Sequence, residues 1–190
     1  MSYSTNYKSS APYCHWYMTI CDLKSHIEER CKEITEKHHK QLENYHINLE
    51  EAYKNGEEYG MIYEQHNDLS LDIRLKQNNE LISLENEIKS VLEKVLKEII
   101  SHFELSKKRK IDKSYLSSYI QEIEEKKKIN MVEFSKEKKD IFLLNTNRNN
   151  SEHKSDNLLR EIDQTYIQQQ LNSVYSYMNA LIQKLYNNKE

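Results

Sequence analysis

The stretch that decides the fold is LISLENEIKSVLEKVLKEIISHF, residues 81–103. Its apolar residues recur every three or four positions, which is the repeat of one face of an α-helix. Charged residues such as Glu87, Lys94 and Lys97 occupy positions between them. The stretch therefore predicts an amphipathic helix whose apolar stripe is wide enough to contact two neighbouring helices.

The composition extends this prediction to the whole chain. Among 190 residues there are only two glycines and one proline, so helix breakers are almost absent. Hydrophobic residues make up 37% and charged residues 31%, against about 45–50% and about 25% in typical globular domains. Such a polar chain can bury narrow apolar seams but not a thick core. We predict an all-α fold: an elongated, coiled-coil-like bundle of about four long amphipathic helices.

Breaks in the apolar pattern divide the chain into four segments. Residues 1–12 are expected to form a loose N-terminal arm, and residues 13–144 a helical region of about three helices with a turn at Asn55-Gly56. Apolar residues alternate with polar ones over residues 69–75, where we favour a helix or irregular connector over a strand docked elsewhere. The Asn-rich residues 145–156 predict a polar linker, and residues 157–188 a C-terminal amphipathic helix.

Two apolar seams are the candidate partner-binding surfaces. The C-terminal seam, our first choice, has steps of three and four residues and comprises Leu171, Val174, Met178, Leu181 and Leu185. The N-terminal seam, our second choice, includes Ile20, Leu23, Ile27, Ile34 and Leu42. A helix of about 40 residues would reach roughly 60 Å, which exceeds what a compact domain of this size requires. We therefore expect other helical chains to complete the seams, as a hetero- or homo-oligomer.

Residues with catalytic or metal-binding chemistry do not form a recognisable motif. Cysteines and histidines gather near the N-terminus without zinc-ligand spacing, and Glu36 and His39 form a single Glu-x-x-His with no second copy. Two glycines cannot supply a glycine-rich nucleotide-binding loop. We predict a non-enzyme without cofactor, and a helical-bundle metal protein is a less favoured alternative.

A basic cluster carries the main alternative function. Its members are Lys107, Lys108, Arg109 and Lys110. We favour a solvated helix end, and a nuclear-import signal or a phosphate-facing patch is the alternative. The formal net charge of −3 predicts no bulk attraction to nucleic acid.

Three cysteines, an odd number, and a polar N-terminus without an apolar signal region predict reduced thiols in the cytoplasm or nucleus. No apolar run approaches the roughly 18–20 residues of a membrane span. The sequence thus predicts a structural or interaction subunit, a scaffold component of a larger helical assembly. The alternative is a nuclear accessory protein associated with nucleic acid.

Overall fold

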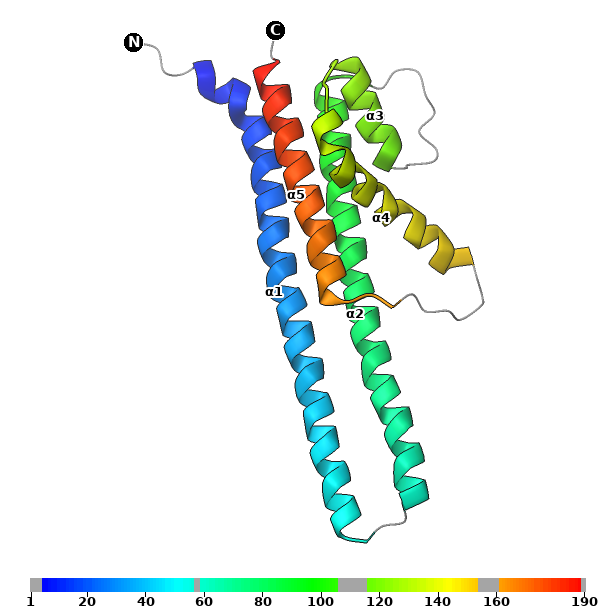
Figure 1. The fold of residues 1–190 in the computed structure, drawn as a ribbon. Coiled ribbons are helices and arrows are strands. Elements are labelled where there is room, and N and C mark those ends of the chain that lie inside the picture. The colour runs from blue at the N-terminus through cyan, green and yellow to red at the C-terminus, as the bar shows by residue number, and fades with distance from the viewer. Residues whose placement is uncertain (1–4, 57–58, 106–115, 154–160, 189–190) are drawn as a thin grey trace.

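The structure is a computed structural model that describes residues 5–56, 59–105, 116–153 and 161–188. These residues form five α-helices and one short 3-10 helix, without a strand among them. The helices are α1 (Thr5–Lys54), α2 (Tyr59–His102), α3 (Leu116–Lys126), α4 (Ser135–His153) and α5 (Gln164–Asn187), with the 3-10 helix η1 at Val132–Phe134. The predicted elongated, all-α fold is confirmed (Figure 1).

Helices α1 and α2 form one long antiparallel hairpin, with 50 and 44 residues respectively. The hairpin turns at Asn55-Gly56, as predicted, where Gly56 has a φ of 78°. A glycine adopts this left-handed conformation without the steric cost that a Cβ would bring. Residues 69–75 lie inside α2, so the helical alternative for this segment is confirmed. Their alternation does not mark a sheet face, because Leu69 and Leu71 are exposed while Ile73 is buried.

Three element boundaries differ from the sequence prediction. Helix α1 begins at Thr5, within the segment expected to be a loose arm, and Pro12 lies inside it. A proline there removes one backbone hydrogen bond without ending the helix. Helix α4 continues to His153, through most of the predicted linker. Helix α5 begins at Gln164 rather than 157, because the side chain of Asp163 caps it by accepting the backbone N–H of Tyr166 at 2.7 Å.

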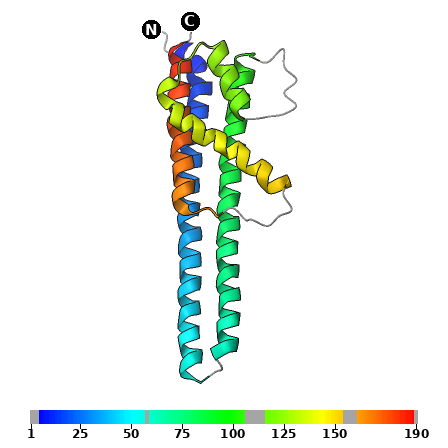
Figure 2. The same ribbon diagram turned by 45° about the vertical axis from the view of Figure 1, so that its right-hand side comes forward.

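The molecule consists of a helical head and a protruding arm (Figures 1 and 2). In the head, α5 packs against both α1 and α2, and α3 and α4 complete the bundle. The apolar faces of the three long helices meet there, and Ile27, Ile88 and Leu181 are fully buried. We call residues 42–56 and 59–75 the arm and the other described residues the head. In the views of Figures 1 and 2 the two helices of the arm extend beyond the end of α5.

Candidate partner-binding interface

Helix α5 shows what the groove between α1 and α2 accommodates. Tyr17 of α1 is hydrogen-bonded to Tyr175 of α5 and to Cys21, and these bonds raise the pKa of Tyr17 to about 12. Glu85 of α2 accepts the hydroxyl hydrogen of Tyr166 at 2.8 Å. These contacts identify the side of the α1–α2 pair that faces α5, and they show that the groove accepts an amphipathic helix.

Just before α5 begins, two further contacts mark the end of the filled groove. Asn78 of α2 accepts the backbone N–H of Ile162 at 2.9 Å. On α1, Cys31 is buried. Burial is the main cause that raises the pKa of its thiol, and the negative charge of the nearby Asp163 raises it further. Cys31 and Asn78 therefore lie on the α5 side of their helices, close to where the third helix starts.

Helical geometry places the next residues of the arm on the same side. Residues 18 positions apart in an α-helix are separated by five full turns, so Leu49, eighteen residues after Cys31, shares its direction. Tyr53 stands 36 residues after Tyr17, which is ten turns. On α2, Leu71 is seven residues before Asn78, two turns along one helix stripe. The side that α5 covers in the head thus continues along the arm.

We use the name arm groove for this strip of surface along the α1–α2 pair, and five apolar side chains define it: Leu42, Leu49, Tyr53, Leu71 and Leu75. Tyr53 is 64% exposed and Leu71 is 56% exposed, while the other three are half-buried. From Leu42 to Tyr53 the groove runs along roughly 16 Å of helix. Apolar side chains of this size are exposed here although the same groove is sealed in the head.

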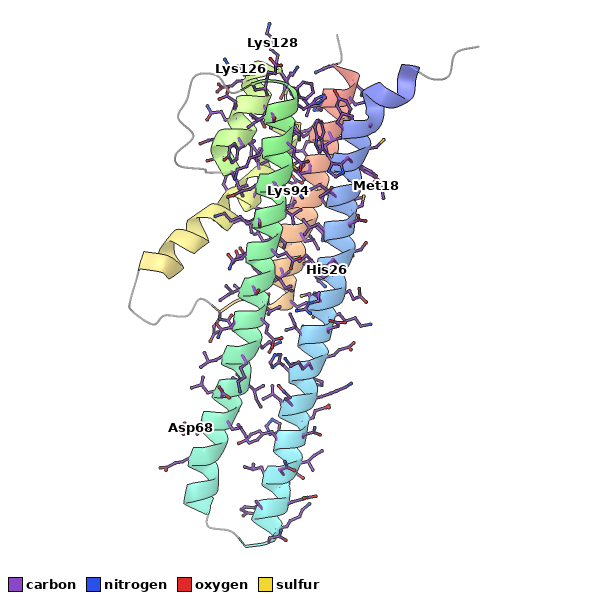
Figure 3. The ribbon with its side chains drawn as sticks, turned by 180° about the vertical axis from the view of Figure 1, so that it is seen from behind. Met18, His26, Asp68, Lys94, Lys126 and Lys128 are labelled. Atoms are coloured by element: carbon purple, nitrogen blue, oxygen red, sulfur yellow. The ribbon has the colours of Figure 1, made fainter. Side chains whose placement is uncertain are left out.

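The opposite side of the arm provides a contrast. Leu69 is 48% exposed and stands eighteen residues before Glu87, so the two residues share a direction. Glu87 forms an ion pair with His26 at 3.3 Å, on the α1–α2 face that looks away from α5 (Figure 3). Leu69 and Leu71 are therefore two leucines of similar exposure on opposite faces of the arm.

Charge is distributed unevenly along the sequence. Residues 43–73 contain a single basic residue, Lys54, and eight acidic ones: Glu43, Glu50, Glu51, Glu57, Glu58, Glu64, Asp68 and Asp72. Because the whole chain has a formal net charge of only −3, the remainder is net positive. Figure 3 shows Asp68 on the arm and the lysines Lys126 and Lys128 at the far end of the head. The arm is therefore the acidic pole of the molecule.

The base of the arm is fastened by polar contacts between α1 and α2. Lys37 donates a hydrogen bond to Glu80 at 2.6 Å, and the Nε2 atom of the buried His38 lies 3.4 Å from the same carboxylate. The hydrogen bond from Lys37 is the main cause that holds the pKa of Glu80 below its usual value. Glu80 therefore stays ionised at neutral pH and links the two helices near the start of the arm.

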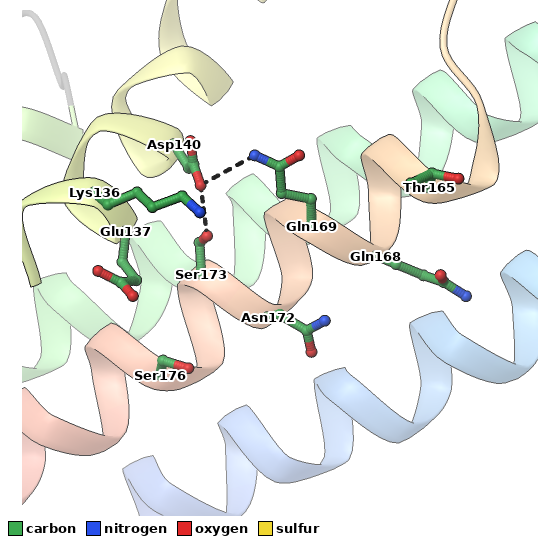
Figure 4. A pocket seen from close by; sticks show the side chains of 9 residues that line it. All are labelled: Lys136, Glu137, Asp140, Thr165, Gln168, Gln169, Asn172, Ser173 and Ser176. Atoms are coloured by element: carbon green, nitrogen blue, oxygen red, sulfur yellow. Dashed lines mark hydrogen bonds between the residues drawn. The ribbon is translucent and has the colours of Figure 1, made fainter.

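A concave region lies between α4 and α5, with a volume of about 490 Å³ (Figure 4). At its centre the buried Asp140 accepts hydrogen bonds from the Ser173 hydroxyl at 2.7 Å and the Gln169 amide at 3.4 Å. Its lining residues include neither a histidine nor a cysteine, so Ser173 has no imidazole base beside it in this groove. The region offers polar groups to a ligand, and its serine hydroxyl donates to the Asp140 carboxylate.

The predicted C-terminal seam is filled from within the chain. All five of its residues are buried in the head, where α5 packs against α1 and α2: Leu171, Val174, Met178, Leu181 and Leu185. Its apolar periodicity was sound, but the covering helices belong to the same chain. We therefore do not carry this seam forward as a surface for another protein.

The predicted N-terminal seam divides between head and arm. Ile20, Leu23, Ile27 and Ile34 are buried in the head, and Leu42 is half-buried at the start of the arm groove. Leu42 is thus the one predicted partner-binding residue that the structure leaves in the arm. Sequence reasoning missed Tyr53 and Leu71, although the continuation of the α1 repeat toward Leu49 was a signal for that surface.

The remaining candidate residues do not form a site. The basic cluster Lys107, Lys108, Arg109 and Lys110 lies outside the described residues. Along α1, Cys14 is exposed and Cys31 is buried, and His39 forms an ion pair with Glu43 at 3.2 Å. Within the part of the chain that the structure describes, no three metal-binding side chains come together.

Comparison with known proteins finds no match to a family model, to a curated protein or to a solved structure. None of the described helices combines the length and the apolar character needed to cross a membrane. A function for this chain is therefore inferred from its fold and its exposed surfaces.

Proposed function

We propose that this chain is a non-catalytic interaction subunit whose arm groove binds a helix of another protein. The observation that carries the proposal is the continuity of the groove. Helix α5 fills it along the head, and the same side of α1 and α2 then exposes Tyr53 and Leu71 along the arm. An amphipathic helix that lays its apolar face into a groove is a common mode of protein recognition.

The size of the apolar surface is sufficient for weak binding. Fully burying a large apolar side chain contributes about 1.5–3 kcal/mol, and association costs at least about 4 kcal/mol in lost freedom. Five side chains, three of them already half-buried, supply about 5–10 kcal/mol in total, and the surplus of about 1–6 kcal/mol fits affinities around the millimolar range. The ion pair and hydrogen bond at Glu80 hold the arm helices together, so the partner meets a preformed surface.

The free cysteines support a reducing compartment as part of this proposal. Among the described residues all three cysteines are free, and Cys31 is buried where no second cysteine joins it. Reduced thiols are typical of proteins in the cytoplasm or nucleus.

The two leucines on opposite faces of the arm supply the test. We would measure the binding of a fluorescent 24-residue amphipathic peptide, with leucines at heptad positions a and d and neutral flanks, by fluorescence anisotropy. Leu71→Asp places a charge in the arm groove and is expected to weaken binding at least tenfold, which corresponds to about 1.4 kcal/mol or more. Leu69→Asp makes the same chemical change on the opposite face, and we expect its affinity to stay within about twofold of the parent.

Both leucines are about half-exposed, so neither substitution removes a buried contact. Circular dichroism would check that the helical content of each variant equals that of the parent. Equal losses of affinity in the two variants, or no binding by the parent chain, would contradict the proposed function.

A further inference from the structure

We infer that the helix bound by the arm groove is basic, with lysine or arginine residues on both sides of its apolar stripe. This inference rests on the proposed function and specifies the chemistry of the partner. The inference rests on the positions of acidic residues beside the arm groove, and not only on the number of acidic residues in the arm.

Acidic side chains flank the arm groove on both helices. On α1, the exposed Glu50 lies three residues before Tyr53, and on α2 the exposed Asp68 lies three residues before Leu71. Residues three apart are neighbours on a helix surface. A helix seated on Tyr53 and Leu71 would therefore place its flanking side chains next to these carboxylates.

The basic residues near the groove compensate these charges only in part. Lys54 is 4.0 Å from Glu50, and both side chains are largely exposed, so their pairing is weak. Arg74, three residues after Leu71, lies at the end of the groove nearest the head. Beyond Arg74, toward the arm tip, the groove side of α2 carries Glu64 and Asp68 without a lysine or arginine.

Two other carboxylates near the arm, by contrast, already have lysine partners. Lys76 donates to Asp72 at 2.6 Å, and Lys37 donates to Glu80 at 2.6 Å. Glu50 and Asp68 thus place part of the acidic excess of the arm beside the exposed apolar side chains. In helix pairs, charges that flank the apolar seam set partner choice, and complementary charge raises association rates and selects against wrong partners.

A second copy of this chain is a poorer occupant than a separate basic helix. The long helices of the head already bury their apolar faces in one another. The arm of a second copy carries the same negative charge, so two arms would repel each other. The charge and the available faces together favour another protein.

The test compares two peptides that share one apolar heptad pattern. One carries lysine and the other glutamate at positions e and g, and binding to the full chain is measured by anisotropy at 50 mM and 300 mM NaCl. We expect the lysine peptide to bind at least tenfold more tightly at 50 mM, and the ratio to fall to about threefold at 300 mM because salt screens exposed charges.

A pair of double variants with equal net charge locates the effect. Glu50→Gln with Asp68→Asn removes the carboxylates beside the groove, and we expect it to weaken lysine-peptide binding about fivefold. Glu33→Gln with Glu51→Gln removes the same charge from exposed α1 positions that are not three or four residues from any side chain of the arm groove, and we expect a change below twofold. Equal effects of the two double variants would show that only overall charge matters and would overturn the inference.

The remaining outcomes separate this inference from the proposed function. If both peptides bind equally well and Leu71→Asp weakens both, the arm groove binds helices but does not select a basic one, which overturns the inference alone. If neither peptide binds, the proposed function fails as well. If light scattering shows a dimer that Leu71→Asp dissociates, the occupant is a second copy, and the inference is wrong.

Discussion

Replacing Leu181 with alanine is expected to lower the free energy of unfolding by about 3 kcal/mol. Leu181 lies on α5 with no exposed surface, in the seam that joins α5 to α1 and α2. Removing a buried leucine side chain costs its transfer free energy and leaves a cavity that tightly packed neighbours fill only in part. Urea denaturation monitored by circular dichroism measures this loss.

Leu143→Ala on α4 is the matched control, because Leu143 is exposed. We expect its free energy of unfolding to stay within about 0.5 kcal/mol of the parent. The experiment also shows whether helices of the same chain or of another chain cover the C-terminal seam. A midpoint of denaturation that depends on protein concentration would mean that another chain contributes to the seam, contrary to the fold described above.

Trp16→Ala is expected to have the largest effect on stability, a loss of about 4 kcal/mol. Trp16 is buried in the head near the start of α1. The centroid of its ring lies 5.3 Å from that of Tyr13 and 5.4 Å from that of His102. The ring centroids of Tyr13 and Tyr186 of α5 are also 5.3 Å apart. The cluster therefore joins the beginning of α1 to the ends of α2 and α5, and its rings meet edge to face, a favourable arrangement.

Thermal unfolding provides the measurement for Trp16→Ala. For a chain of this length, about 4 kcal/mol corresponds to a fall in Tm of about 8–16 °C. Met18→Ala is the control, since Met18 is exposed two residues away and points away from the neighbouring helices (Figure 3). A loss below about 1 kcal/mol for Trp16→Ala would show that the cluster does not close the head.

The repeat of apolar residues was enough to predict the fold class and most of the packing. Ile27, Ile88 and Leu181 were each part of a predicted stripe, and each is fully buried. The turn at Asn55-Gly56 was predictable because glycine adopts the positive φ found there without the steric cost that a Cβ brings. These features depend on local chemistry, which is written directly in the sequence.

Element boundaries were harder to predict because several local signals point the wrong way. Pro12 suggested that α1 begins after it, and the Asn-rich residues 145–153 suggested a linker, yet both lie in helices. The alternation of apolar and polar residues over 69–75 resembled a strand. It arises in a helix because Leu69 and Leu71 are both exposed, on opposite faces of the arm. Helix propensity is a weak preference that the surrounding structure readily overrides.

The candidate site could be predicted only in part. Periodicity shows that Leu42 and Leu181 lie on apolar faces, but it does not show which helix covers each face. The structure supplies that information. The part of the groove that α5 covers stops near Asn78, which is hydrogen-bonded to Ile162 just before α5 begins. Tyr53 and Leu71 acquire their significance only from this boundary.

Hydrogen–deuterium exchange, measured with and without the lysine-flanked peptide, tests the central claim most directly. The account predicts that the free chain exchanges slowly in the head and faster in the arm, where two helices pack without a third. On addition of the peptide, protection should increase in residues 42–54 and 64–75 and stay unchanged in α5. Protection confined to the head, or no change anywhere at saturating peptide, would contradict the claim that the arm groove is the binding surface.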